Sequence, residues 1–202
     1  GGNVPGGYNP DATEVWQEAL RIPPVKVYDK GKLRKDVWDL IFANIRFDMV
    51  QHDMRAQMGA CTVGERRLLE LLGKYGKESF NAHKKALFQS TRQMMESEIF
   101  KIPNGRYSGE GMVYYDGHHL GSEFTIRVDI DVYDKSIKFD YSRTDAQTNG
   151  FVNGTYTSSA SATILTLLQM INPDIPHNEG MIEPLEIIIP EGTILNASYP
   201  KA

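Results

Sequence analysis

The sequence predicts an α+β fold, with a helical first half followed by antiparallel strands and a packed helix. Up to about residue 100, apolar residues recur at the spacing of amphipathic helices. From 124 to 133 the period changes, and Phe, Ile and Val alternate with Thr, Arg and Asp. Helices that are segregated from antiparallel strands are typical of α+β proteins. We therefore expect a helical region over residues 1–102, beginning with a glycine-rich loop, and a β region with one helix over 103–202.

Four helical segments are expected in the first region. The first begins at Asn9-Pro10, because a capping Asn followed by proline at the first helical position is a common helix start, and it ends near Leu20. The prolines of the RIPPVKVY stretch make the next segment extended. Gly76 is expected to separate two long helices, since glycine adopts the conformation that ends a helix. The remaining helices are expected over residues 34–45, 46–75 and 78–100.

The second region is expected to contain four strands and one helix. The turn at 134–136 joins two alternating segments, which predicts an antiparallel hairpin with one solvent-facing side. Small and apolar residues from Ser158 to Ile171 predict a helix. The strands are expected over residues 111–115, 124–133, 137–141 and 182–189.

Composition and charge limit the class of protein. Hydrophobic residues make up 41% and charged residues 24% of the chain, so it can bury a core. The net charge of -4 argues against a dedicated binder of nucleic acid or of anionic membranes. No apolar run reaches the length of a transmembrane helix. Cys61 is the only cysteine, which excludes an internal disulfide and favours a reducing, cytoplasmic setting.

The stretch FDMVQHDMRAQ, residues 47–57, raises the question of a metal site on the helix expected there. Asp48 and His52 lie one turn apart and could touch, but Arg55 shares their stripe and would repel a cation. A metal site needs three or four ligands, and no further carboxylate or imidazole lies on the side of the helix that carries Asp48 and His52. We therefore interpret it as a face that meets solvent or a partner subunit. Cys61 falls on the opposite, apolar face, where we expect it to be buried.

Other polar groups are also candidates for a site. His118 and His119 follow an Asp-Gly turn, and neighbouring strand residues point to opposite faces, so we interpret them as histidines of a loop tip. The HNEG stretch, which begins at His177, lies in a proline-stiffened loop, where a functional role and ordinary turn chemistry explain it equally well. Arg21 follows Glu18 by three residues, and a local ion pair is the simplest interpretation.

Two common catalytic motifs are missing from the sequence. It holds no glycine-rich loop followed by Lys-Ser/Thr and no Gly-x-Ser-x-Gly elbow. The GFVNG stretch at 150–154 could bind an anion through its backbone amides. The chain opens on Gly-Gly without a methionine and closes directly after a strand-like segment. We therefore expect an interior piece of a longer subunit, with a processed terminus as the alternative.

Five long motifs resemble one family in the same order. The first half holds GGNVPGGYNPDATEVWQEALRIPPVKVY, DLIFANIR and DMRAQMGACTVGERRLLELLGKYG, and the second half holds FDYSRTDAQTNGFVN and NPDIPHNEGMIEPLEIIIPEGTILNASYP. Together they resemble the hydantoinase B / 5-oxoprolinase / acetone carboxylase α-subunit family over essentially the whole chain. The QHDMRAQMGACTVGERRL stretch is most similar to the acetone carboxylase α subunits within that family.

The resemblance implies ATP-dependent chemistry that is divided between subunits. A hydantoinase A-type β subunit would bind ATP, and a small γ subunit would complete the complex. The α-type subunit would carry Mn²⁺ or another divalent metal, which would polarise a carbonyl oxygen. The reaction implied converts the ketone acetone and bicarbonate to acetoacetate through phosphorylated intermediates. The alternatives are an ATP-dependent hydantoinase or 5-oxoprolinase amidohydrolase, an acetophenone carboxylase, and a scaffold without a catalytic role.

The resemblance also implies that the His and Asp ligands of the metal lie just upstream of Gly1. This chain would then hold no metal ligand or cofactor and would be inactive alone, while residues 1–3 would lie beside the missing ligands. Asn153 belongs to a family motif and has no assigned role. The candidates for a catalytic or site-wall role are Glu18, Arg21, Asn178 and Glu179.

Overall fold

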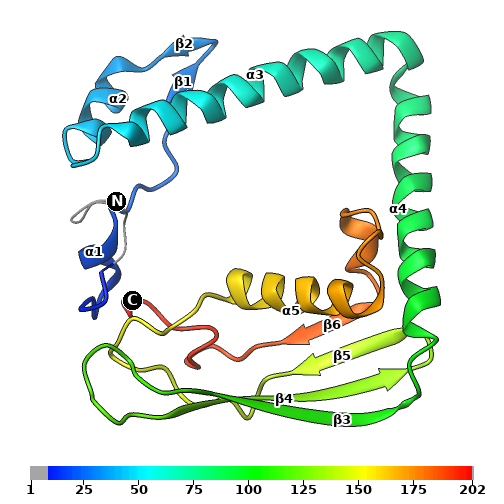
Figure 1. The fold of residues 1–202 in the computed structure, drawn as a ribbon. Coiled ribbons are helices and arrows are strands. Elements are labelled where there is room, and N and C mark those ends of the chain that lie inside the picture. Colours follow the sequence, from blue (N-terminus) through cyan, green and yellow to red (C-terminus); the bar gives the residue numbers. More distant parts are fainter. Residues whose placement is uncertain (1–8, 202) are drawn as a thin grey trace.

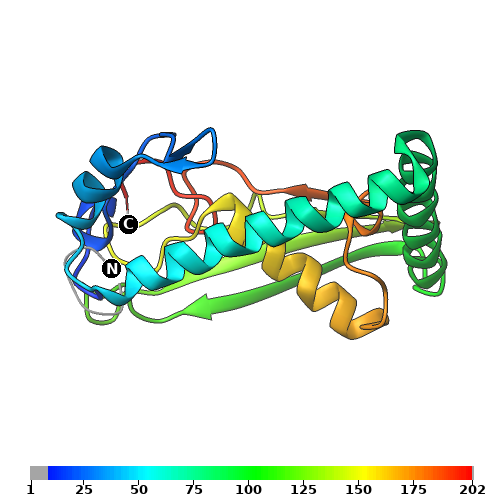
Figure 2. The same cartoon turned by 90° about the horizontal axis from the view of Figure 1, so that it is seen from above.

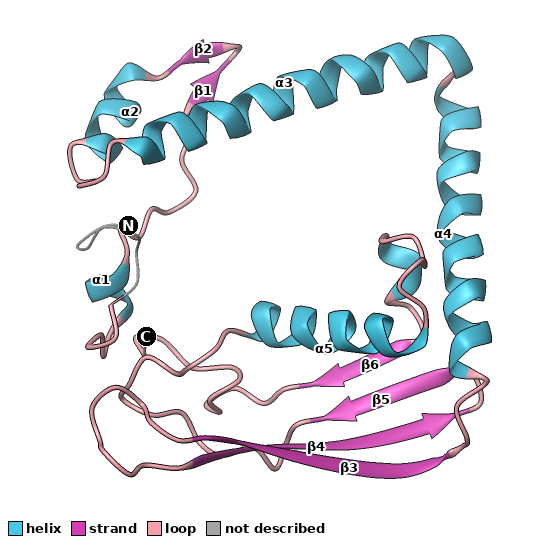
Figure 3. Cartoon of the chain, viewed as in Figure 1, coloured by secondary structure: helices cyan, strands magenta, loops and turns pink. Residues whose placement is uncertain are grey.

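The computed structural model describes residues 9–201, and the glycine-rich loop expected at 1–8 lies outside them. The α+β class is confirmed, since helices make up most of the first half and a sheet with one long helix makes up the second (Figure 3). The helices of the first half are α1 (Val15–Glu18), α2 (Lys35–Phe42), α3 (Met49–Tyr75) and α4 (Lys77–Ile99), with a two-residue hairpin β1 (Tyr28–Asp29) and β2 (Lys32–Leu33) before α2.

The two long helices meet in a sharp corner at Gly76 (Figure 1). The φ of Gly76 is 76°, a conformation that glycine adopts without the steric cost of a side chain, so the predicted stop is confirmed. From this corner, α3 runs back along the length of the molecule toward the N-terminal segments (Figure 2). The corner thus joins a helical arm to the sheet through α4.

The first helix is much shorter than the sequence suggests. The Asn9 carbonyl accepts the N–H of Ala12 at 3.1 Å, which makes a turn, so the predicted helix start at Asn9 is wrong. The side chain of Gln17 instead accepts the N–H of Glu14 at 3.0 Å, and this capping box sets the start of α1 at Val15. The prediction failed because the short Asn side chain favours turns as well as helix caps.

The sheet has the strand order β3-β4-β5-β6, with one helix packed on it. The first three strands are antiparallel, and the tight turn after β4 places Asp134 at a φ of 50°. Strand β6 pairs with β5 in parallel, because α5 carries the chain back between them. The elements are β3 (Gly105–Val113), β4 (Phe124–Tyr133), β5 (Ser136–Asp140), α5 (Tyr156–Ile171), the 3-10 turn η1 (Glu179–Met181) and β6 (Leu185–Ile188).

The hydrophobic core lies where the end of α4, the sheet and α5 meet. Met95 and Ile99 of α4 are fully buried, and Leu167 and Leu168 of α5 pack in the same cluster. The sheet contributes Val132, Ile137 and Phe139. The core therefore lies at the α4 end of the sheet. The loops at the other end of the sheet lie outside this core.

Helix α3 differs from its prediction in burial rather than in position. Its amphipathic pattern predicts a buried apolar face, but none of its residues is buried in the described chain. Cys61, expected inside, is exposed, so that expectation is wrong for this chain. The reason is that no described element packs along the apolar face of α3 beyond its two ends.

Candidate functional site

The first and last described segments of the chain lie against each other (Figure 1). The N–H of Val15 donates to the carbonyl oxygen of Pro200 at 3.0 Å, and Glu14 forms an antiparallel bridge with Lys201. The ammonium of Lys201 also donates to the side-chain oxygen of Asn149, in a loop of the β region. We name this region the terminal junction. It consists of residues 9–21, 115–122, 145–153 and 196–201.

Aromatic rings hold Arg21 within the terminal junction. Trp16 and Tyr199 meet edge to face, with ring centroids 5.0 Å apart. The guanidinium carbon of Arg21 lies 4.1 Å from the Tyr199 centroid and 6.0 Å from that of Trp16. A guanidinium that stacks on a ring keeps N–H donors available for a carboxylate or phosphate. Glu18 lies half-buried at the end of α1, and in the described chain it forms no ion pair with Arg21, contrary to the interpretation from spacing.

The stacking of Arg21 on Tyr199 is expected to couple the two ends of the chain. In a double-mutant cycle with Arg21→Gln and Tyr199→Leu, we expect a coupling energy of about 0.5–1 kcal/mol, the usual range for exposed cation–π pairs. The measurement is the free energy of urea unfolding of the subunit and its three variants. Additive effects of the two substitutions would contradict the stacking interaction.

The terminal junction contains a buried carboxylate, that of Asp116. The residue is 0% exposed, and its carboxylate accepts four hydrogen bonds. One oxygen accepts the N–H groups of His118 at 2.9 Å and His119 at 2.8 Å. The other accepts the hydroxyl of Thr148 at 2.7 Å and meets Nδ1 of His119 at 2.9 Å. Because Thr148 is 32 residues away in sequence, the carboxylate ties two separate loops together.

The hydrogen bonds to Asp116 decide its charge. Burial by itself raises the pKa of the carboxyl, whereas the bonds from His119, Thr148 and the N–H of His118 lower it. The bonds outweigh burial, so the pKa lies well below the ordinary value of 3.8. Asp116 is therefore ionised at neutral pH and can accept from all four donors.

The ionised Asp116 orients the ring of His119. When Nδ1 donates to the carboxylate, the neutral imidazole carries its lone pair on Nε2. The side chain is 65% exposed, so it can be approached from solvent. An imidazole held in this way can accept a proton or act as one ligand of a metal. The interpretation as loop-tip histidines missed this arrangement, although the Asp-x-x-His spacing was available as a signal.

Two glycines allow the backbones of the terminal junction to approach closely. A Cβ on Gly150 would lie 1.8 Å from the carbonyl oxygen of Asp116, and a Cβ on Gly117 would lie 2.4 Å from that of Pro10. The N–H of Phe151 donates to the same Asp116 oxygen at 3.0 Å. These contacts bring the segment around Pro10 onto the Asp116 loop.

The GFVNG stretch is used inside the fold rather than for an anion. The N–H of Gly154 donates to the carbonyl of Ile194, and that of Phe151 is engaged at Asp116. The side chain of Asn153 accepts the N–H of Thr148 at 3.0 Å and donates to its carbonyl at 2.9 Å. Asn153 thus holds the loop that carries the Thr148 hydroxyl toward Asp116, and the anion site considered from the sequence is not formed by these two amides.

The segment around η1, which holds the candidates Asn178 and Glu179, lies elsewhere, beside α4 (Figure 1). The side chain of Asn178 accepts the N–H of Gly180 at 2.9 Å and donates to the hydroxyl of Thr91 in α4 at 2.8 Å. Glu179 is exposed at the start of η1. The structure therefore brings Glu18 and Arg21 into the terminal junction and places Asn178 and Glu179 apart from it, where Asn178 anchors a loop to α4.

The remaining histidine candidates do not join a polar cluster. His52 is exposed on the first turns of α3, and His177 is exposed before η1. Among residues 9–201, no three His, Cys, Asp or Glu side chains are grouped so that they could hold a metal ion. Asp116 and His119 could supply at most two metal-ligating side chains. Both carboxylate oxygens of Asp116 already accept hydrogen bonds. The described residues by themselves therefore do not fit a divalent metal.

None of the helices within residues 9–201 combines the length and the apolar character that crossing a bilayer would require.

Comparison with known proteins bears on the family and the fold of this chain. The Hydantoinase B/oxoprolinase family matches the chain over residues 1–202. The chain belongs to the Hydantoinase B/oxoprolinase family. Within this family, the chain is 37% identical over 203 residues to the beta subunit of the caprolactamase of Pseudomonas jessenii, covering 99% of this chain and 34% of that protein. It is 31% identical to a subunit of the putative D-/L-hydantoinase of Pseudomonas sp. (strain NS671), covering 94% and 34%.

Solved structures agree with the family assignment. The ATP-dependent caprolactamase of Pseudomonas jessenii matches with a TM-score of 0.91 and 36% identity, over 99% of this chain and 34% of that one. A nucleotide-free acetone carboxylase matches with a TM-score of 0.85 and 19% identity, over 97% and 28%, which shows a shared fold. This chain therefore spans about a third of the length of the relatives that it matches.

Proposed function

We propose that this chain is part of a subunit of an ATP-dependent enzyme that hydrolyses a cyclic amide. The observation that supports this most strongly is the similarity to the caprolactamase beta subunit, at 37% identity over 99% of the chain. The match to a hydantoinase subunit points to the same class, since a hydantoin is also a ring closed by amide bonds. The proposal places the amide hydrolase, an alternative in the sequence analysis, ahead of the carboxylase.

In this proposal the subunits divide the chemistry. ATP binds a partner of the hydantoinase A type, and its phosphoryl group activates the amide carbonyl toward water. The present chain contributes the terminal junction, where Asp116 fixes the His119 ring and Arg21 offers guanidinium donors. These groups can orient a polar substrate and accept a proton during addition of water. The complex works in the cytoplasm.

In this proposal, the ligands of a divalent metal such as Mn²⁺ come from residues other than those that the structure describes. Those residues do not supply a ligand set, so no step here is assigned to a metal. The prediction that His and Asp ligands stand upstream of Gly1 concerns residues beyond this chain. When bound, such a metal would polarise a carbonyl oxygen.

Acetone carboxylation is the second candidate. It is suggested by the QHDMRAQMGACTVGERRL stretch, which resembles the acetone carboxylase α subunits. The complex would then include a small γ subunit and use acetone and bicarbonate. The structural similarity to acetone carboxylase, at 19% identity, concerns the fold and does not favour this substrate.

The test is an assay of the complete complex, purified with its partner subunits. We expect ATP-dependent opening of ε-caprolactam, hydantoin or 5-oxoproline, with one phosphate released per ring opened and no reaction without ATP. Incorporation of labelled bicarbonate into acetoacetate from acetone, without lactam hydrolysis, would instead support the carboxylase. Lactam hydrolysis that is unchanged when this subunit is omitted would contradict the proposal.

A further inference from the structure

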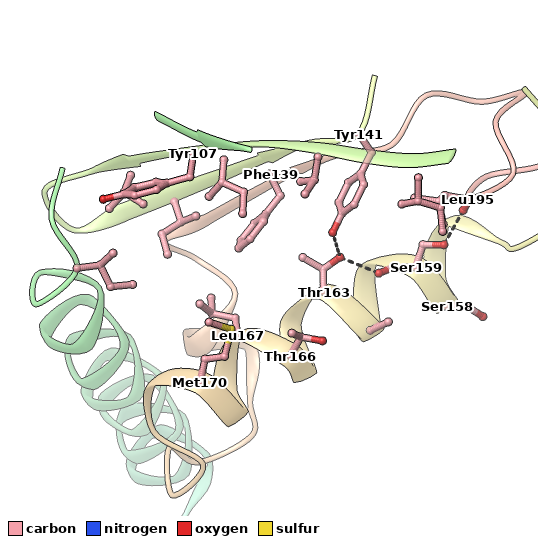
Figure 4. A pocket seen from close by; sticks show the side chains of 17 residues that line it. Tyr107, Phe139, Tyr141, Ser158, Ser159, Thr163, Thr166, Leu167, Met170 and Leu195 are labelled. Carbon is pink, nitrogen blue, oxygen red and sulfur yellow. Dashed lines mark hydrogen bonds between the residues drawn. The ribbon is translucent and has the colours of Figure 1, made fainter. Parts of the chain in front are cut away.

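An apolar groove runs between the sheet and α5 (Figure 4). Its volume is about 750 Å³, and its walls include Ile126, Val128 and Ile130 of β4 and Leu167 and Met170 of α5. None of its lining residues carries a charge. The three β4 side chains lie on the face that alternation predicted to be buried, yet each is only partly covered. The groove is therefore core-type surface that α5 covers incompletely.

Three hydroxyl groups in the wall of the groove, those of Tyr141, Ser159 and Thr163, are already paired (Figure 4). The Tyr141 hydroxyl bonds Thr163 Oγ1 at 2.8 Å, and Thr163 donates to the Ser159 carbonyl at 2.9 Å. The Ser159 hydroxyl donates to the carbonyl of Leu195 at 2.7 Å. Small-molecule sites usually present a few free polar groups that orient the ligand. These three hydroxyls instead form hydrogen bonds within the chain. The groove is therefore suited to apolar side chains of a polypeptide.

Helix α3 shows the same lack of cover. None of its residues is buried, and Leu68, Leu69 and Leu71 are 43%, 60% and 45% exposed. Helices in proteins gain most of their stability from packing an apolar face. Exposed apolar patches are typical of surfaces that contact another molecule or another segment of the protein.

We infer that the groove is an internal packing surface, covered by an apolar segment of the same subunit from outside these 202 residues. The inference rests on the proposed function, in which the chain is part of a subunit as long as its relatives. The chain covers 34% of the caprolactamase beta subunit, so roughly two-thirds of such a subunit is available to supply the segment. A segment on the same chain also has a high effective concentration at the groove, unlike a separate protein.

The first test measures the accessibility of the groove in the whole complex. In a Cys61→Ser background, Val128→Cys places a thiol in the groove, and Asp131→Cys places one on the opposite face of the same strand. We expect maleimide to modify Val128→Cys roughly 100-fold more slowly in the native complex than after unfolding, because labelling needs local opening. Rapid native labelling at position 128, equal to that at 131, would overturn the inference.

The second test identifies the occupant through Met170, whose side chain is 79% exposed in this chain and lines the groove. Photo-methionine is close in shape to methionine, so its incorporation preserves the fold. We expect ultraviolet light to join the Met170 peptide to a peptide of the same polypeptide from outside these 202 residues. A cross-link to a second copy, to another subunit or to a small apolar molecule would overturn the inference, as would no cross-link.

The two proposals fail in distinguishable ways. An intact subunit mass near the 22.8 kDa of this chain would remove the shared premise. A much larger subunit with an open groove would overturn the inference alone. A covered groove in a complex that does not open cyclic amides would overturn only the proposed function.

Discussion

Replacing Gly180 with alanine is expected to cause a loss of about 3 kcal/mol in the free energy of unfolding. A Cβ at this position would lie 2.0 Å from the carbonyl oxygen of Phe88 and 2.8 Å from its carbon, so the clash is with the backbone of α4. Backbone cannot relax as the tip of a flexible side chain can. The strain would also pull Asn178 from its bond to Thr91. Urea unfolding of the intact subunit measures the loss.

The matched control is Gly59→Ala in α3. Nothing lies within 4 Å of a Cβ there, and alanine favours a helix interior by about 1 kcal/mol relative to glycine. We therefore expect Gly59→Ala to leave stability unchanged or to raise it. If the two variants behaved alike, the close approach of η1 to α4 would not be what fixes this loop.

Replacing Asp116 with asparagine is expected to have an effect of similar size, about 3 kcal/mol. The amide keeps the shape of the carboxylate but loses its charge, and its NH₂ group faces donors where the carboxylate accepted them. The His119 ring would lose its fixed orientation, which its NMR signals would report. Asp174→Asn, on an exposed loop, is the control and is expected to change stability by less than about 0.5 kcal/mol.

The Asp116 contribution is also expected to depend on pH in a defined direction. The pKa of the carboxyl is lowered in the folded chain, so its stabilising effect is complete above the ordinary value of 3.8 and is lost as the pH falls below it. The difference in unfolding free energy between the native subunit and Asp116→Asn should thus be constant from about pH 5 to 7 and shrink below about pH 4. A difference that grew as the pH fell would contradict the lowered pKa.

Much of the fold could be predicted because its elements are set by local patterns. The 124–133 strand is confirmed as β4, and the long helices start and stop within a few residues of their predicted positions around Gly76. In these segments the apolar period and the turn residues point to the same structure. At Asn9 the local signal is ambiguous, because an Asn side chain can either cap a helix or form a turn. The prediction of a helix start failed there.

The parallel pairing of β6 with β5 was less accessible from the sequence. Periodicity identifies a strand but not its neighbour, and the predicted antiparallel arrangement holds only for β3, β4 and β5. The candidate site shows the same limit more strongly. The family resemblance suggested Glu18 and Arg21 as part of the site wall, and the HNEG loop added Asn178 and Glu179, but only the first two lie in the terminal junction.

The sequence by itself determined the α+β class, the order of the elements and the membership of a family, because these follow from periodicity and from long ordered motifs. Only the tertiary structure decided which polar groups meet. The buried, ionised Asp116 accepts a hydrogen bond from the hydroxyl of Thr148, 32 residues away in the sequence. Arg21 stacks on the ring of Tyr199, near the other end of the chain. Contacts of this kind depend on how the loops and ends are brought together in space, which local residue spacing does not encode.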